Sequence, residues 1–89
     1  MNIVACSAIK NTRDTKPGIR LYQFEDGSIQ INEILPNGLF AQTPLRKGYE
    51  LVSVNNIECR GMLDSDVMDI INNAESVVTV VAITAKGEY

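Results

Sequence analysis

The stretch NTRDTKPGIRLYQ, residues 11–23, combines the charge and the backbone features of an anion-binding loop. Arg13 and Lys16 precede a Pro17-Gly18 step, and an extended apolar segment begins at Ile19. Glycine lets backbone N–H groups converge on one point, and nearby cations favour an anion there. The alternative is a polar turn before a strand. We expect an anion-binding loop formed by Arg13, Lys16, Pro17, Gly18 and Ile19.

The side-chain inventory excludes several kinds of catalytic and metal site. The chain has no histidine, so a Ser-His triad cannot form within it and the commonest metal ligand is missing. Asp64, Asp66 and Asp69 would spread around a helix instead of converging on a metal ion. Cys6 and Cys59 are too few for a disulfide scaffold, and we expect both to be reduced and packed as small apolar residues. We therefore expect no enzyme activity, no metal and no cofactor.

Composition bounds the size and the partners of the protein. Eighty-nine residues, 45% hydrophobic and 21% charged, predict one globular domain over 1–89, with a core at about 3–83 and a polar tail at 84–89. The net charge is −3 and the basic residues are scattered, which argues against nucleic-acid binding. No apolar run approaches the roughly 20 residues that span a bilayer, so we expect no membrane insertion. The first residues lack the basic segment of a signal peptide, and we expect a cytoplasmic location.

Apolar periodicity then predicts the elements that position the loop. Alternating and β-branched residues predict strands at 3–9, 19–24, 29–34, 49–56, 57–59 and 76–84. Asp26-Gly27 and Asn55-Asn56 indicate tight turns between neighbouring strands. Segment 35–43 contains Pro-Asn-Gly followed by one short helical turn.

One amphipathic helix is expected at 63–75. Val67, Ile70, Ile71 and Ala74 follow the helical period and form its core stripe. Acidic and capping residues at 64–66 suit its positive end. Too few helices alternate with strands for a parallel sheet. The predicted fold class is therefore α+β and mainly antiparallel: a small, partly open β-barrel or sandwich of five to six strands, with one main helix and one short helical turn.

Three motifs in this order resemble a PDZ domain over nearly the whole chain. PGI at 17–19 resembles the carboxylate-binding loop of that family, and ILPNGLFAQTPLRKGYELVSVNN at 34–56 resembles its central segment. DSDVMDIINNAESVVTVVAI at 64–83 resembles the groove helix and the final strand. Tyr49 and Asn56 depart from the usual Asp and Gly of the central segment. The loop is built on KPGI, or alternatively on GIRL with Arg20 in place of the glycine.

The resemblance implies that a free peptide C-terminus binds as an added strand between residues 19–23 and the helix. Its carboxylate would lie on the loop amides, and its last side chain would enter a pocket of Pro17, Ile19, Leu21, Met68 and Ile71. That pocket is apolar, so the last ligand residue should be apolar; the alternative is that these are plain core residues. We expect a charge at Ile71 to abolish binding while the fold persists. The implied groove residues are Arg20, Leu21, Tyr22, Gln23, Asp64, Met68, Ile71 and Asn72.

Two groove residues give conflicting indications of specificity. Asp64 occupies the helix position at which many PDZ domains carry a histidine that selects Ser or Thr two residues before the ligand end. As an aspartate, it would favour a hydroxyl group or a basic residue there and disfavour acidic ones. Met68 would favour an apolar residue at the same place. Asp64 is alternatively only the N-cap of the helix, so the specificity class stays open.

The resemblance implies a peptide-binding module for scaffolding, signalling or localisation. The loop precedes the helix, which is the order usual in eukaryotic scaffold-type PDZ domains. One alternative is a regulatory domain of a larger enzyme, such as a protease. Another is a self-associating domain, in which the C-terminal Tyr89 docks in the groove of a neighbouring copy.

Overall fold

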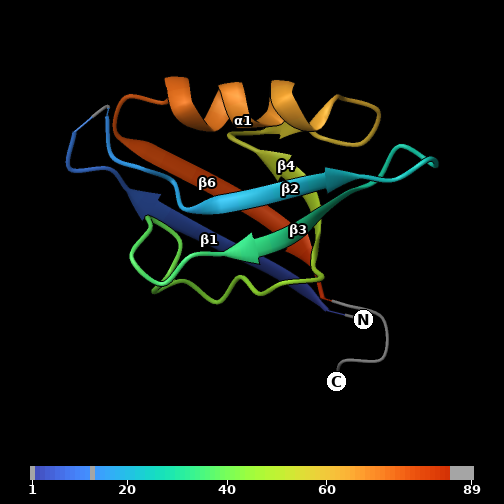
Figure 1. The fold of residues 1–89 in the computed structure, drawn as a ribbon, viewed down its shortest axis with the longest axis horizontal. Coiled ribbons are helices and arrows are strands. Elements are labelled where there is room, and N and C mark those ends of the chain that lie inside the picture. The colour runs from blue at the N-terminus through green and yellow to red at the C-terminus, as the bar shows by residue number, and fades with distance from the viewer. Residues whose placement is uncertain (1, 13, 85–89) are drawn as a thin grey trace.

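Six strands and one helix follow one another along the chain as the apolar periodicity predicts (Figure 1). The structure is a computed structural model that describes residues 2–12 and 14–84. Its elements are β1 (Ile3–Ile9), β2 (Ile19–Gln23), β3 (Ile29–Ile34), β4 (Glu50–Val54), β5 (Ile57–Glu58), α1 (Asp64–Asn73) and β6 (Val77–Ile83). These bounds differ from the predicted ones by at most two residues at either end.

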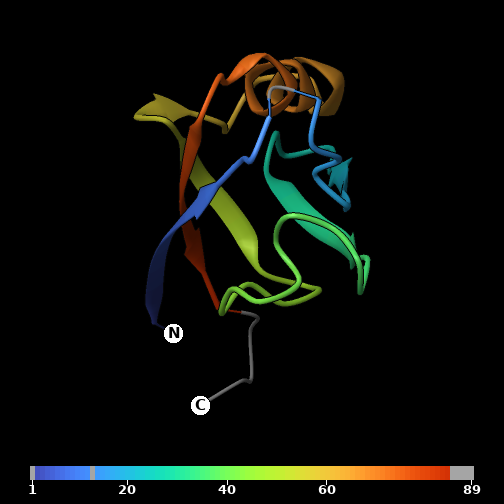
Figure 2. The ribbon, with the colours of Figure 1, turned by 90° about the vertical axis from the view of Figure 1, so that its left-hand side faces the viewer.

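The strands form one antiparallel sheet in the order β1-β6-β4-β3-β2, and β5 pairs with β4. Figure 2 shows the sheet curling, so that β2 and β3 lie across the interior from β1, β6 and β4, while α1 covers one open end. β1 and β2 are the two edges of the sheet, so the barrel is open between them. This arrangement confirms the predicted fold class.

Apolar side chains from five strands, from α1 and from the connecting segments fill the interior. Of the predicted helix stripe, Val67 and Ile71 are completely buried, and Ile70 and Ala74 pack half-buried against the core. Burying a Val or Ile side chain contributes roughly 1.5–3 kcal/mol, so this stripe holds the short helix on the sheet. The largest side chains that are less than 2% exposed are those of Ile29, Ile31, Phe40, Leu45, Leu51, Val54, Cys59, Val67, Ile71, Val78 and Val80.

The turns adopt the backbone that their residues predict. Asn55 and Asn56 have φ values of 49° and 67° and join β4 to β5 as a two-residue hairpin turn. In the turn between β2 and β3, Asp26 Oδ1 accepts hydrogen bonds from the N–H and the hydroxyl of Ser28 at 2.9 and 2.7 Å. Segment 35–43 forms successive turns closed by i→i+3 hydrogen bonds in place of the one short helical turn that the sequence predicts there.

The first turn of α1 excludes one interpretation of Asp64. The N-cap residue is Leu63, whose side chain makes no hydrogen bond to the free N–H groups at the start of the helix. Asp64 is the first helical residue, and its Oδ1 accepts a hydrogen bond from the N–H of Ser65 at 2.8 Å. Asp64 is therefore not the N-cap, although its charge still lies at the positive end of the helix dipole.

Lys10 holds the opposite end of α1. The last turn of the helix contains no basic residue. Lys10 directly follows β1 and is only 3% exposed, and its Nζ donates to the carbonyls of Asn72 and Ala74 at 3.1 and 2.8 Å. A cation near the negative end of a helix and charge-assisted hydrogen bonds both stabilise the fold. One side chain directly after the first strand thus anchors the helix.

Replacing Lys10 by methionine keeps the aliphatic stem and removes both hydrogen bonds to the helix end. We expect Lys10→Met to lower the free energy of unfolding by about 1.5–3 kcal/mol, because two carbonyls lose a charged donor. Urea denaturation followed by circular dichroism measures the change. Lys16→Met, at an exposed position, is the matched control and should change stability by less than about 0.5 kcal/mol. Equal effects of the two substitutions would contradict the anchoring role.

Candidate functional site

A backbone contact between two glycines positions the predicted loop. Gly18 has a φ of 63°, in the left-handed region, and immediately precedes β2. A Cβ on Gly18 would lie 2.4 Å from the Cα of Gly38, and a Cβ on Gly38 would lie 2.9 Å from the carbonyl oxygen of Pro17. Glycine is therefore required at position 18 both by its φ and by this close approach.

Two hydrogen bonds fix the loop on the segment that follows β3. The carbonyl of Lys16 accepts from the N–H of Leu39 at 3.2 Å, and the carbonyl of Gly18 accepts from the N–H of Leu35 at 2.8 Å. Both loop carbonyls are thus turned toward one side. Because Pro17 has no N–H, the donors that this stretch can offer a ligand are the amides of Gly18 and Ile19.

The backbone fits a loop built on KPGI better than one built on GIRL. Gly18 makes the bend, whereas Arg20 lies inside β2, where its Nε is 3.4 Å from Oε1 of Glu33 in an exposed ion pair. Lys16 is exposed beside the loop, which leaves its ammonium group available to a ligand. Arg13, the other predicted cation, lies outside the described residues.

The strand after the loop has main-chain groups on its open side. Ile19 is paired with Ile34, and the adjacent hydrogen bond joins the carbonyl of Gly18 to the N–H of Leu35. Hydrogen bonding alternates along an antiparallel ladder, so the N–H and C=O of Ile19 point away from β3. α1 lies along this side of β2 and runs in the opposite direction (Figure 1). An extended peptide could therefore pair with β2 beneath the helix.

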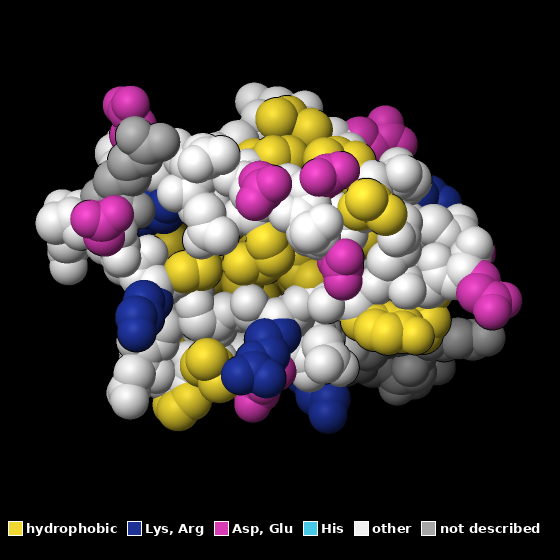
Figure 3. All heavy atoms as spheres, turned by 45° about the horizontal axis from the view of Figure 1, so that its top comes forward, with side chains coloured by type: hydrophobic (Ala, Val, Ile, Leu, Met, Phe, Trp, Pro, Cys, Tyr) yellow, Lys and Arg dark blue, Asp and Glu magenta, His cyan; other side chains and the backbone are white. Residues whose placement is uncertain are grey.

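Apolar side chains form the floor between β2 and α1. Leu21 and Met68 are half-buried against the core, Ile19 is 5% exposed, and Pro17 is half-buried at the loop. Figure 3 shows apolar side chains at the bottom of a hollow below α1, with acidic side chains along its rim. We define this hollow, with Pro17, Ile19, Leu21 and Met68 as its apolar lining, as the groove. Its surface suits an apolar ligand side chain.

Ile71 lies beneath the groove and not on its surface. Its side chain is 0% exposed and belongs to the hydrophobic core. A charge at this position would be buried without a partner, which costs several kcal/mol. The expectation that a charged residue at Ile71 would abolish binding while the fold persists is therefore wrong. Met68, three residues earlier and half-buried, is the position at which a charge can test the groove.

The other β2 residues predicted for the groove divide by strand alternation. Arg20 and Tyr22 are exposed on the outer face of the strand, where the Tyr22 ring packs edge-on against Phe24 with ring centroids 5.0 Å apart. Gln23 is half-buried, and its Nε2 donates to the carbonyl of Met62 at 2.6 Å. This hydrogen bond ties the end of β2 to the segment that leads into α1, so Gln23 closes the end of the groove away from the loop.

The helix wall of the groove is acidic. α1 carries Asp64, Asp66 and Asp69 and no lysine or arginine. Asp64 is half-buried at the end of α1 away from the loop, and one of its oxygens accepts from Ser65. Asn72, also predicted for the groove, is exposed, and its carbonyl accepts from Lys10. The wall therefore repels acidic groups and can accept hydrogen bonds near Asp64.

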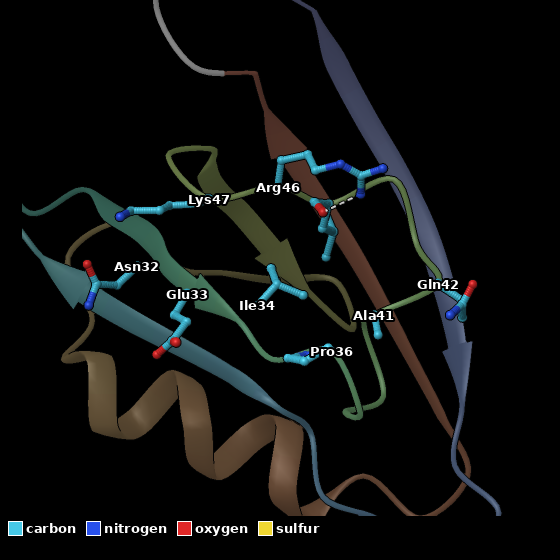
Figure 4. Close-up of a pocket in the computed structure, with 9 residues that line it drawn as sticks. Asn32, Glu33, Ile34, Pro36, Ala41, Gln42, Arg46 and Lys47 are labelled. Atoms are coloured by element: carbon cyan, nitrogen blue, oxygen red, sulfur yellow. Dashed lines mark hydrogen bonds between the residues drawn. The ribbon is translucent and has the colours of Figure 1, made fainter.

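Two further hollows lie outside the groove. The larger, of about 780 Å³, lies between β3 and the segment that follows it (Figure 4). There Arg46 Nη1 donates to the carbonyls of Thr43 and Leu45 at 2.7 and 2.8 Å. The guanidinium group thus braces its own loop. The smaller, of about 290 Å³, borders the loop at Lys16 and Gly18. The larger hollow is lined by Asn32, Glu33, Ile34, Pro36, Ala41, Gln42, Leu45, Arg46 and Lys47.

Burial makes both thiols less acidic. Both cysteines are free, as predicted. Burial raises the pKa of Cys59 to about 11, and it also raises the pKa of Cys6, an effect that a hydrogen bond with the Thr43 side chain partly offsets. Across residues 2–12 and 14–84, no group of three or more cysteine, aspartate or glutamate side chains is placed to hold a metal ion. Nor does any helix within these ranges have the length and apolar character to cross a membrane.

Three contacts that shape the site are not apparent from the sequence. Gly38 reads as an ordinary turn glycine, yet it receives the backbone of Gly18. Lys10 reads as the start of a polar loop, yet it is buried against the end of α1. Nothing in the sequence indicates that the carbonyl of Met62 accepts a hydrogen bond from Gln23. Each contact joins segments far apart in the chain, so no local pattern could have indicated its partner.

Comparison with known proteins gives consistent matches. The family model of the PDZ domain matches residues 7–83. The fourth PDZ domain of MUPP1 is 30% identical, with a TM-score of 0.78 over 91% of this chain and 74% of that chain. The PDZ domain of GIPC from a choanoflagellate, solved alone and bound to the GAIP peptide, has a TM-score of 0.87 at 14% identity over 100% of this chain and 97% of that chain. No curated protein sequence matches the chain.

The contact between Gly18 and Gly38 predicts a difference between two alanine substitutions. Gly18 and Gly61 both have positive φ, 63° and 90°, where alanine is strained by about 1–2 kcal/mol. A Cβ on Gly61 meets nothing within 4 Å, whereas a Cβ on Gly18 meets the backbone of Gly38. We expect Gly18→Ala to cost about 1–3 kcal/mol more than Gly61→Ala, as measured by urea denaturation. Equal losses would mean that the two backbones separate without cost.

Proposed function

The chain belongs to the PDZ domain family, and from this premise we propose that it is a peptide-recognition module for the free C-termini of partner proteins. The peptide adds as a strand along the open side of β2, within the groove below α1. The observation that carries the proposal is the outward-facing main chain of Ile19 beside this apolar groove. Capture of C-termini would let the protein scaffold or localise its partners.

A solved relative of the same fold supports the proposal. The choanoflagellate GIPC domain has been solved with the GAIP peptide bound. At 14% identity that likeness is one of fold, and the fold spans 100% of this chain. The MUPP1 domain, at 30% identity, supports assignment to the same kind of interaction module. Neither likeness identifies a partner of this chain.

The terminal carboxylate is proposed to bind the amides of Gly18 and Ile19. Both loop carbonyls are engaged with Leu35 and Leu39, which leaves the amide side of the bend for an anion. Each charge-assisted hydrogen bond contributes roughly 1.5–3 kcal/mol. Lys16 is exposed, so its attraction adds under about 1 kcal/mol and falls with salt.

The last ligand side chain is proposed to enter the apolar lining of the groove. Pro17, Ile19, Leu21 and Met68 offer only carbon and sulfur there, so Val, Leu, Ile or Phe suits the position. A polar side chain would lose its hydration without gaining a hydrogen bond. Ile71 supports this lining from the core beneath it.

The acidic wall is proposed to act mainly by exclusion. Asp64 disfavours acidic residues upstream of the ligand end, because like charges would face one another across the groove, and the charges of Asp66 and Asp69 elsewhere on α1 add a weaker, longer-range repulsion. Asp64 can also accept a hydrogen bond from a hydroxyl or a basic residue near the far end of the groove. Affinity should be roughly micromolar, since a short peptide buries little surface and loses its freedom on binding.

A titration with paired peptides tests the carboxylate site. Peptides with varied C-terminal sequences are compared with a free carboxylate and with an amidated end. We expect amidation to weaken binding roughly 10- to 100-fold, because it removes the charge from hydrogen bonds that contribute about 1.5–3 kcal/mol. Isothermal calorimetry or fluorescence anisotropy measures the affinities. Equal binding of both forms would overturn the carboxylate site.

Two matched substitutions show whether that binding uses the groove. Met68→Lys places a charge in the apolar lining at a half-buried position and should abolish binding with the fold retained. Ile57→Lys introduces the same charge at an apolar residue on β5 that is 45% exposed, and it should leave binding unchanged. Binding that survives Met68→Lys in a folded protein would place the peptide elsewhere.

The role of Asp64 is tested by changing the ligand preference. Asp64→His should move selection toward Ser or Thr at the third residue from the ligand end, because a neutral imidazole hydrogen-bonds a hydroxyl without repelling acidic neighbours. Selection from a randomised peptide pool measures the preference. An unchanged preference would mean that Asp64 contributes only to the charge at the start of α1.

A further inference from the structure

β1 offers a second open edge, at the opposite end of the sheet from the groove. It is the terminal strand in the order β1-β6-β4-β3-β2, and Figure 2 shows it on the outside of the molecule, away from β2. Its pairing with β6 is regular from Ile3 opposite Ile83 to Ile9 opposite Val77, without a bulge. The strand is therefore regularly paired along its whole length before any partner arrives.

The hydrogen bonds at both ends of β1 reveal which groups face outward. The carbonyl of Asn2 accepts from the N–H of Thr84 at 2.9 Å, and the N–H of Lys10 donates to the carbonyl of Ser76 at 2.6 Å. Even-numbered residues are thus bonded to β6. By the alternation of an antiparallel ladder, the N–H and C=O groups of the odd-numbered residues point to the open side. These residues are Ile3, Ala5, Ser7 and Ile9.

This edge lacks the features that keep edge strands apart. Natural edges are usually protected by charged residues, proline, bulges or short length, whereas Ile3–Ile9 has seven residues and neither charge nor proline. The one adjacent lysine, Lys10, is buried against α1 and gives the edge no charge. Ile3 and Ile9 are 76% and 72% exposed, the highest values among the large apolar side chains in the described ranges.

The sequence of β1, IVACSAI, is close to a palindrome centred on Cys6. Antiparallel pairing of two copies about this residue sets Ile3 of one opposite Ile9 of the other, and Ala5 opposite Ser7. All of these are odd-numbered residues, whose N–H and C=O groups face outward and can bond the second copy. The symmetry of the sequence and the alternation of hydrogen bonds therefore favour the same register. The two most exposed isoleucines would cover one another as cross-strand pairs.

We propose that the outer edge of β1 pairs with the same edge of a second copy of this chain, antiparallel about a two-fold axis at Cys6. The interface is self-complementary and closes as a dimer, because each copy has one such edge. It joins the two sheets into one and leaves both β2 edges free at its far ends. The inference does not depend on peptide binding, because it uses the opposite edge of the sheet.

Sedimentation equilibrium of the full chain from micromolar to millimolar concentration tests the dimer. We expect the average mass to rise from 9.8 kDa toward twice that value as concentration increases. Ile3→Lys combined with Ile9→Lys should keep the mass at that of a single chain, because lysines would then face one another at both ends. Both positions are exposed, so the fold should persist, and circular dichroism checks this. Ile57→Lys, on β5, is the control and should dimerise normally.

A charge reversal tests the register within the same experiment. Ile3→Lys combined with Ile9→Glu places opposite charges face to face in the antiparallel pairing, so dimerisation should return at low salt and weaken as salt is added. A parallel pairing would set like charges together and would not be rescued. A wild-type chain that stays at 9.8 kDa throughout overturns the proposal, as does a dimer that the lysine pair leaves intact. Association lost only on deleting Glu88 and Tyr89 would point to tail docking and would also overturn it.

Cys6 supplies an independent measure of the register. In the proposed dimer the two Cys6 residues form a pair without hydrogen bonds, where Cα atoms lie about 4.5 Å apart, within the range of a disulfide. Mild oxidation at alkaline pH, which offsets the raised pKa of the half-buried Cys6 thiol, should link two wild-type chains through Cys6. Cys6→Ser should remove the product, because the other cysteine, Cys59, is completely buried. A dimer that gives no product through Cys6 overturns the proposed register.

Discussion

The close approach of Gly18 to Gly38 is the constraint from which the candidate site follows. Because no side chain separates the two backbones, the carbonyls of Lys16 and Gly18 can bond the segment after β3. These two hydrogen bonds turn the amides of Gly18 and Ile19 outward and determine where β2 begins. They therefore also determine which residues of β2 bond β3, and they leave the N–H and C=O of Ile19 free to bond a ligand. The close packing of two glycine backbones thus determines which main-chain groups of β2 can bind a peptide.

An open antiparallel barrel has two edges, and this chain treats them differently. The edge at β2 lies below α1, so any strand that pairs there must also fit a walled groove, which makes it selective. The edge at β1 has no wall, and its selectivity would come from sequence symmetry alone. Lys10 affects both edges. Its buried ammonium group holds α1 in place above β2, and because it is buried there, the end of β1 carries no exposed charge.

The two indications of ligand specificity differ in strength. Met68 is half-buried against the core, so covering it removes apolar surface from water at roughly 25 cal/mol per Å². Asp64 is partly exposed, and one of its oxygens is already bonded to Ser65, so its attraction for a ligand is screened and shared. Within the proposed function, apolar contact with Met68 contributes more to the affinity than Asp64 does, and the acidic wall mainly excludes wrong ligands. Met68 therefore affects mainly the affinity and Asp64 mainly the specificity, so the two indications need not conflict.

Local patterns in the chain were enough to predict the strands, the helix, the Asn55-Asn56 turn and the bend at Gly18, because periodicity and positive-φ preferences act within a few residues. They also indicated that Ile71 faces the sheet, but not that it lies wholly beneath the groove. Depth of burial depends on elements that arrive from elsewhere in the chain, and so do the partners of Gly18 and Lys10. Periodicity reports the direction of a side chain, whereas the packing of distant segments sets how far it is covered and what it contacts.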